Sequence, residues 1–143
     1  MTDVVAIAQR IQSESKTLQA VAERLSTGTP LRVTAEIDPV DALVPKEDWI
    51  HVLRFVQEAL HNVLKHAAAT EAAVTLREDD LVLRLVVRDN GAGFAPGSTP
   101  GGGLGLTTMG ERARILRADL AIESSPAAGT TLRLDIPRRG ERI

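Results

Sequence analysis

A glycine-rich segment between two ordered elements most constrains how this chain can fold. The segment RDNGAGFAPGSTPGGGLGLTTMGERA, residues 88–113, holds most of the 11 glycines of the sequence. The aliphatic run LVLRLVV precedes it, and its end continues into ERARILRA, a run of good helix formers. Loops of this length without regular structure are uncommon in compact domains, and they are usually functional or disordered. The segment therefore predicts a functional loop that joins a strand to a helix.

The composition limits both the core and the partners. The chain has 143 residues, which suits one domain, and 43% of them are hydrophobic but only 2% aromatic, so the core must be aliphatic. With 17 basic and 19 acidic residues the net charge is -2, so nothing favours nucleic acid or direct membrane contact. The lack of cysteine excludes disulfides and cysteine-ligated zinc. No apolar run has membrane-spanning length and no signal-peptide core is present, so we expect a cytoplasmic location, alone or as part of a larger membrane protein.

The N-terminal residues 3–25 predict a helix, which STGTP then ends. One interpretation is a coiled-coil seam that forms a homodimer. The other is a helix that packs on its own domain, which we favour because three heptads are few and Glu14 and Ser15 interrupt the seam. The apolar residues with this spacing are Val4, Ile7, Ile11, Leu18, Val21 and Leu25.

A strand and a long helix follow. LRVTAEI, residues 31–37, alternates and contains β-branched residues, so it predicts a strand. Asp48 is the predicted N-cap of the helix, with Pro45 just outside. The apolar face of the helix is expected to contain Leu53, Val56, Leu60, Val63, Leu64 and Ala67.

The second half of the chain predicts two strand pairs with a helix between them. Residues 72–78 and 81–87 read as an antiparallel hairpin with an Asp-Asp turn. A helix is expected over residues 106–117, then strands over 120–124 and 130–136. The order of elements predicts an α/β (α+β) two-layer sandwich, with one mixed, mostly antiparallel sheet and helices on one face.

The glycine segment does not match other common loops. The Asn-Gly pair at residues 90–91 favours a hairpin, but AGFAPGSTPGGG is not a strand. A calcium loop needs several carboxylates, and only Asp89 is present. A Walker-type loop needs a lysine where Glu111 stands, and a dinucleotide fingerprint needs a glycine where Leu106 stands. A flexible linker remains open, although each glycine cluster adjoins an ordered element.

The two ends of this segment favour opposite parts of one ligand. Asp89 ends a buried strand, and a buried carboxylate needs a partner such as a ligand amino group. Gly91 and Gly93 let the backbone approach that ligand without a Cβ in the way. GGGLGL, residues 101–106, leads into a helix whose first N–H groups attract phosphate. An adenine nucleotide has both an amino group and phosphates.

The polar face of the long helix contains Glu58 and Asn62, four residues apart, with Lys65 on the same face and His66 at its edge. One interpretation is a solvated surface. The other is a polar cavity, in which the Asn62 oxygen binds Mg²⁺, Lys65 neutralises phosphate and Glu58 acts as a general base.

Three stretches together resemble the nucleotide-binding boxes of the GHKL ATPase superfamily, which has the Bergerat ATP-binding fold. They are QEALHNVLKHA (residues 57–67), DNGAGF (89–94) and GGGLGL (101–106). The stretch over residues 109–137 is most similar to sensor histidine kinases of two-component systems, in the subgroup whose response regulators carry helix-turn-helix domains. The similarity runs from about residue 30 to residue 137.

The resemblance implies a site for ATP and Mg²⁺. Asn62 matches the Mg²⁺ ligand, Glu58 matches the acid proposed to assist transfer, and Lys65 and His66 match positions near the phosphates. Asp89 matches the aspartate that accepts a hydrogen bond from the adenine 6-amino group. The other implied ATP-binding positions are Gly91 and Gly93 beneath adenine, Gly101, Gly103, Gly105 and Leu106 in the ATP lid and phosphate cradle, and Thr130, which holds adenine through water.

The histidines leave the phosphoacceptor open. No histidine precedes residue 30, where related kinases carry the phosphorylated one, and His51 and His61 are expected to be solvated surface residues. We therefore expect residues 1–29 to be a helix and linker, 30–137 a catalytic domain that lacks its acceptor, and 138–143 a tail. The expected partners are a histidine-containing dimerisation domain and, indirectly, a response regulator. The alternatives are a free-standing regulator resembling anti-sigma-factor serine kinases and a module that no longer binds nucleotide.

Overall fold

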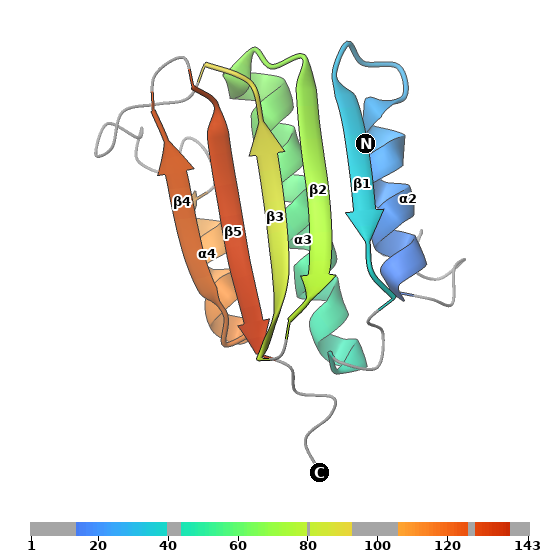
Figure 1. Cartoon of the computed structure of the whole chain (residues 1–143), viewed down its shortest axis with the longest axis vertical. Helices are drawn as coiled ribbons and strands as arrows, with labels where there is room; N and C mark the ends of the chain where they lie inside the picture. The colour runs from blue at the N-terminus through green and yellow to red at the C-terminus, as the bar shows by residue number, and fades with distance from the viewer. Residues whose placement is uncertain (1–13, 40–43, 80, 93–105, 126–127, 138–143) are drawn as a thin grey trace.

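A computed structural model describes residues 14–39, 44–79, 81–92, 106–125 and 128–137 (Figure 1). Helices and strands occur in the predicted order. They are α2 (Glu14–Ser26), β1 (Arg32–Ile37), α3 (Lys46–Asn62), the π-helical turn η2 (Val63–Ala67), β2 (Glu71–Glu78), β3 (Val82–Asp89), α4 (Leu106–Ile115), β4 (Asp119–Ser124) and β5 (Thr130–Pro137).

The strands form one five-stranded sheet in the order β1-β2-β3-β5-β4. The β1–β2 pair is parallel, and the other three pairs are antiparallel. All three helices lie behind the sheet in Figure 1, so they cover one face of it. This confirms the predicted two-layer fold with a mixed, mostly antiparallel sheet.

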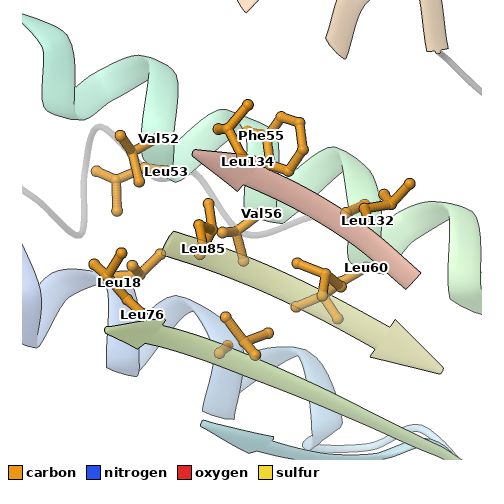
Figure 2. Close-up of a cluster of buried hydrophobic side chains, with 14 of the residues drawn as sticks. Leu18, Val52, Leu53, Phe55, Val56, Leu60, Leu76, Leu85, Leu132 and Leu134 are labelled. Atoms are coloured by element: carbon orange, nitrogen blue, oxygen red, sulfur yellow. The ribbon is translucent and has the colours of Figure 1, made fainter. Parts of the chain in front are cut away.

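The core lies between α3 and the sheet. Leu83, Leu85 and Val87 alternate with more exposed residues along β3 and are at most 2% exposed. Figure 2 shows side chains of α3 meeting those of β2, β3 and β5 in this layer. Apart from Trp49 and Phe55, both on α3, the buried hydrophobic residues are aliphatic or methionine, as the composition predicts. Burial of each large apolar side chain contributes about 1.5–3 kcal/mol, which makes this layer the main source of stability.

Helix α2 packs on the domain, as we favoured. Leu18 and Val21 are fully buried and belong to the same hydrophobic cluster as the sheet residues. Val4, Ile7 and Ile11 lie outside the described residues, as does the side chain of Leu25. The boundary between residues 29 and 30 stays a prediction.

The predicted N-cap of α3 is wrong by three residues. The helix begins at Lys46 and its N-cap is Pro45, while the amide of Asp48 donates to the Pro45 carbonyl oxygen at 2.9 Å. Asp48 thus lies inside the first turn, where its negative charge and that of Glu47 interact favourably with the helix dipole. Pro45 can cap because its fixed φ suits the entry to a helix and the missing N–H is not needed there.

Two further predictions need correction. Leu64 is 36% exposed and does not belong to the core, because the π-helical turn η2 changes the direction of side chains after Asn62. Helix α4 ends at Ile115, two residues early, because Arg117 takes a left-handed conformation with φ of 57°. The amide of Ala118 then donates to the Ala113 carbonyl oxygen at 2.8 Å, which closes the helix in a Schellman arrangement.

Candidate functional site

The predicted site residues that the structure describes lie towards one end of the sheet, where β3 ends and β5 begins. Helix α3 runs upwards behind β2 and β3 in Figure 1, so that its C-terminal end and η2 lie near the end of β3 and the start of β5. Asp89 is the last residue of β3, and it pairs with Ala72 on one side and Thr130 on the other. Antiparallel pairing of β3 with β5 therefore brings two predicted ATP-binding residues, 41 positions apart in sequence, into direct register.

Asp89 is buried, and its charge is only partly compensated. The residue is 8% exposed and lies on the helix-covered face of β3, like Leu85 and Val87 before it. Its carboxylate oxygen Oδ1 accepts from the Gly91 amide at 2.7 Å. Burial raises the pKa of Asp89, and the backbone N–H groups of Gly91 and Thr130 oppose that rise. A further donor would stabilise the charged carboxylate, which fits an adenine amino group.

Gly129 allows the strands to approach closely beside Asp89. Its φ is 78°, and a Cβ at this position would lie 2.2 Å from the Asp89 carbonyl oxygen. Such a distance is far below van der Waals contact, so only glycine fits without a backbone shift. The purine end, by which we mean Asp89, Gly91, Ser124, Gly129 and Thr130, is thus fixed largely by backbone geometry.

The hydroxyl groups of Ser124 and Thr130 form a short chain. Ser124 Oγ donates to the Gly129 carbonyl oxygen at 3.2 Å and lies 2.8 Å from Thr130 Oγ1. A hydroxyl has one proton, so Thr130 must be the donor to Ser124. The lone pairs of Thr130 Oγ1 then remain as acceptors, which suits the water-mediated contact implied for this residue.

Asn90 has a structural role that the sequence analysis missed. Its Oδ1 accepts from the amides of Thr70 and Glu71, both at 3.0 Å, and its Nδ2 donates to Thr70 Oγ1 at 3.0 Å. These bonds connect the residue after Asp89 to the start of β2, which follows η2 in the sequence. The Asn-Gly pair was considered only as a hairpin turn, whereas an asparagine after a strand can also cap neighbouring backbone amides.

The polar face of α3 is not simply solvated. Glu58 Oε1 accepts from Arg112 Nε of α4 at 2.8 Å, and the two side chains are 27% and 19% exposed. Another nitrogen of the guanidinium, Nη1, lies 3.4 Å from His51 Nδ1. The expectation that His51 is a solvated surface residue is therefore wrong, because α4 packs against this side of α3. We call His51, Glu58 and Arg112 the α3–α4 polar cluster.

The phosphate end of the candidate site is described only in part. Asn62, the last residue of α3, is half-buried, and Lys65 in η2 is exposed. His61 is also half-buried rather than solvated, and burial lowers its pKa, aided by the charge of Lys65. The remaining residues predicted for this end lie outside the described part, either entirely or in their side chains: His66, Gly101, Gly103, Gly105 and Leu106. Gly93, predicted to lie beneath adenine, is also outside the described part.

The described residues fit a magnesium ion that phosphate oxygens help to hold. They contain no cluster of three or more histidine or carboxylate side chains that could bind a metal without other ligands. An amide oxygen such as that of Asn62 is a suitable ligand for Mg²⁺, which usually keeps several waters and is bound by one or two protein groups together with substrate phosphates.

Among the described helices, none is long and apolar enough to cross a membrane.

Comparison with known proteins agrees with this geometry. Residues 47–140 match the family model described as histidine kinase-, DNA gyrase B-, and HSP90-like ATPase, which covers more than half of the chain. The chain belongs to this family. The matched region contains α3, the strands that flank Asp89, and the glycine segment. The family assignment confirms the resemblance inferred from the three sequence boxes.

Two similar proteins are named as sensor proteins. Over 115 residues the chain is 35% identical to the nitrate/nitrite sensor protein NarX of Escherichia coli strain K12, a match that covers 79% of this chain and 19% of NarX. It is 36% identical over 117 residues to the sensor protein VraS of Staphylococcus aureus strain COL, covering 82% of this chain and 33% of VraS. The chain thus matches a third or less of the length of these relatives.

A solved structure gives the same assignment. The blue-light activated histidine kinase EL346 of Erythrobacter litoralis superposes with a TM-score of 0.73 at 26% identity, over 90% of this chain and 43% of that protein. The chain is accordingly a catalytic ATP-binding domain of the type found in sensor histidine kinases of two-component systems.

Proposed function

We propose that this domain binds Mg-ATP where the C-terminal ends of α3 and β3 lie beside the start of β5. We propose further that it donates the γ-phosphate to a histidine on a separate dimerisation domain. The observation that carries the proposal is the burial of Asp89 beside Gly129, where the backbone N–H groups of Gly91 and Thr130 donate to a carboxylate at the end of a strand. The similarity to the histidine kinase EL346 supports a histidine as the acceptor.

At the purine end, the Asp89 carboxylate accepts a hydrogen bond from the adenine 6-amino group. Gly91 lets the chain turn beneath the ring, and Thr130 Oγ1 accepts from a bridging water. Guanine carries a carbonyl where adenine carries this amino group, so Asp89 would face an acceptor and the contact would be repulsive. The site should therefore select ATP over GTP.

At the phosphate end, the Asn62 oxygen binds Mg²⁺ and the Lys65 ammonium lies near the phosphates. The bound ion supplies neutralisation of the phosphate charge. Transfer breaks the bond between the γ-phosphorus and the oxygen of ADP, and forms a bond from phosphorus to an imidazole nitrogen of the acceptor. Glu58 acts as the catalytic residue that takes up or orients the imidazole proton. Catalysis then consists mainly of positioning and charge stabilisation.

The proposed partners follow from the same mechanism. The acceptor is a histidine-containing dimerisation domain of the parent protein, and a response regulator receives the phosphoryl group afterwards. We propose a cytoplasmic location for the domain, since its nucleotide is cytoplasmic. A free-standing regulator resembling anti-sigma-factor serine kinases is the alternative, and the similarity to sensor proteins favours the kinase.

The proposal is tested in two steps with the full 143-residue chain. Calorimetric titration should show that Mg-ATP binds and that Mg-GTP binds at least about tenfold more weakly, because one charge-assisted hydrogen bond is lost. The chain is then incubated with γ-labelled ATP and either the separately made dimerisation domain or a candidate sigma factor. Labelling of the histidine domain supports the kinase, and binding of the sigma factor without labelling of the histidine domain supports the alternative.

A further inference from the structure

The α3–α4 polar cluster joins two helices through one side chain. Arg112 lies 54 residues from Glu58 and 61 from His51 along the chain, yet its guanidinium contacts both. Its Nε donates to Glu58 and its Nη1 faces His51 Nδ1, so the planar group is held at two points. In this arrangement the His51 ring carries its proton on Nε2 and accepts at Nδ1. A lysine would not reproduce this arrangement, because its compact ammonium lacks the rigid planar fork that places two nitrogen atoms at fixed positions.

Attachment of α4 to the core does not depend on this ion pair. Met109 of α4 is fully buried and Ala113 is 4% exposed, and Leu116, just after the helix, is also fully buried, so apolar contacts already anchor the helix. A half-buried ion pair gains little net stability, because removal of the charges from water offsets much of their attraction. The cluster therefore calls for an explanation other than stability.

Glu58 has a position in which orientation matters. It lies one helical turn before Asn62 and on the same side of α3, so a shift of its carboxylate changes its distance to anything bound at Asn62. A glutamate side chain has several rotatable bonds, and misplacement of a catalytic group by about 1 Å can cost on the order of 100-fold in rate. The contact with Arg112 Nε at 2.8 Å restricts those bonds.

We propose that Arg112 is a positioning residue, which holds the Glu58 carboxylate in the orientation needed for phosphoryl transfer, while His51 holds the guanidinium from the other side. The inference rests on the proposed function and on the role of Glu58 in it. It assigns to α4 a part in the transfer step that is separate from nucleotide binding. Arg112 acts through Glu58 and touches neither the nucleotide nor the acceptor.

A double-mutant cycle tests the inference. The variants are R112Q, E58Q and the double variant, and each is assayed for the affinity of Mg-ATP and for the transfer rate at saturating Mg-ATP. We expect R112Q to lower the transfer rate about 10- to 100-fold while the ATP dissociation constant stays within about twofold. In the E58Q background, R112Q should cause no further loss, because its effect passes through Glu58. R114Q is the control, since Arg114 is exposed on the same helix, and it should transfer at the normal rate.

Each outcome decides for or against the positioning role. An unchanged rate in R112Q, a loss that adds fully to that of E58Q, or a parallel loss of ATP affinity would overturn it. If R112Q does not fold, as judged by its thermal unfolding curve, H51A replaces it: the rate should fall a few-fold, and only when Glu58 is present. Failure of the unaltered chain to bind Mg-ATP or to transfer phosphate would instead refute the proposed function.

Discussion

The purine end and the phosphate end of the candidate site are built in different ways. At the purine end, Asp89 and Thr130 are fixed by strand register, and Gly129 packs its backbone directly against that of Asp89. At the phosphate end, Asn62 and Lys65 lie where α3 passes into a π-helical turn, and Lys65 is exposed. A rigid end suits recognition of a flat ring, whereas an exposed end at an irregular turn suits phosphates that must be handed on. π-helical turns are often found at functional sites.

The largest expected effect is at the rigid end, in G129A. Alanine would adopt an unfavourable left-handed conformation and its Cβ would collide with the Asp89 carbonyl oxygen. We expect the free energy of unfolding to fall by about 2–5 kcal/mol, measured by urea denaturation. G28A is the matched control, because Gly28 has φ of 77° but nothing within 4 Å of the added Cβ. It should lose only about 1–2 kcal/mol. Equal losses in the two variants would show that close approach at Gly129 is unimportant.

The next effect concerns recognition rather than folding. D89N should weaken ATP binding by about 10- to 100-fold in calorimetric titrations, since a charge-assisted hydrogen bond is worth about 1.5–3 kcal/mol. Asp119 is exposed at the start of β4, so D119N serves as the control and should bind ATP normally. If D89N bound as tightly as the unaltered chain, adenine recognition would have to be assigned to other residues.

A smaller effect is expected at the phosphate end, in N62A. The ion keeps its phosphate and water ligands, so ATP affinity in the presence of Mg²⁺ should fall by only about fivefold. In EDTA the affinities of N62A and the unaltered chain should agree. N62D keeps an oxygen ligand and should retain Mg²⁺-dependent binding. A loss in N62A that is equal with and without Mg²⁺ would mean that Asn62 contacts the nucleotide and not the metal.

The smallest effect is the pH dependence of stability without nucleotide. Burial raises the pKa of Asp89 in the folded chain, so the folded state holds this proton more tightly than the unfolded state does. The stability that Asp89 contributes is therefore present at acidic pH and is lost as the pH rises through the raised pKa. The free energy of unfolding of the unaltered chain, relative to that of D89N, should accordingly increase on acidification. The affinity for ATP should decrease on acidification, because the protonated carboxyl no longer offers a charged acceptor. If D89N became the more stable of the two at low pH, this would contradict the burial of the charge.

Local patterns predict the strands of the rigid purine end, although they do not single out Ser124 or Gly129. Alternating apolar residues before Asp89 predict a strand that ends there, and Thr130 opens the last predicted strand, so pairing of these two strands suffices to bring both residues together. The type and order of the described α-helices and strands follow from such patterns, whereas the π-helical turn η2 does not. Boundaries do not, as Pro45 and Arg117 show, because a proline N-cap and a left-handed arginine carry weak sequence signals.

The contacts between helices could not be predicted in the same way. Arg112 and Glu58 are each ordinary members of a polar helix face, and only the packing of α4 on α3 brings them within 2.8 Å. The exposure of Leu64 has a similar origin, since VLKHA contains no glycine or proline that would announce a π-helical turn. Periodicity assumes a regular helix, and it fails where the helix changes its pitch.

A crystal structure of the chain with a non-hydrolysable Mg-ATP analogue tests the central claim most directly. The account predicts the adenine 6-amino nitrogen at about 3 Å from a carboxylate oxygen of Asp89, with the ring beside Thr130 and the triphosphate leading towards Asn62. Adenine bound elsewhere, with Asp89 still contacted only by the amides of Gly91 and Thr130, would contradict it.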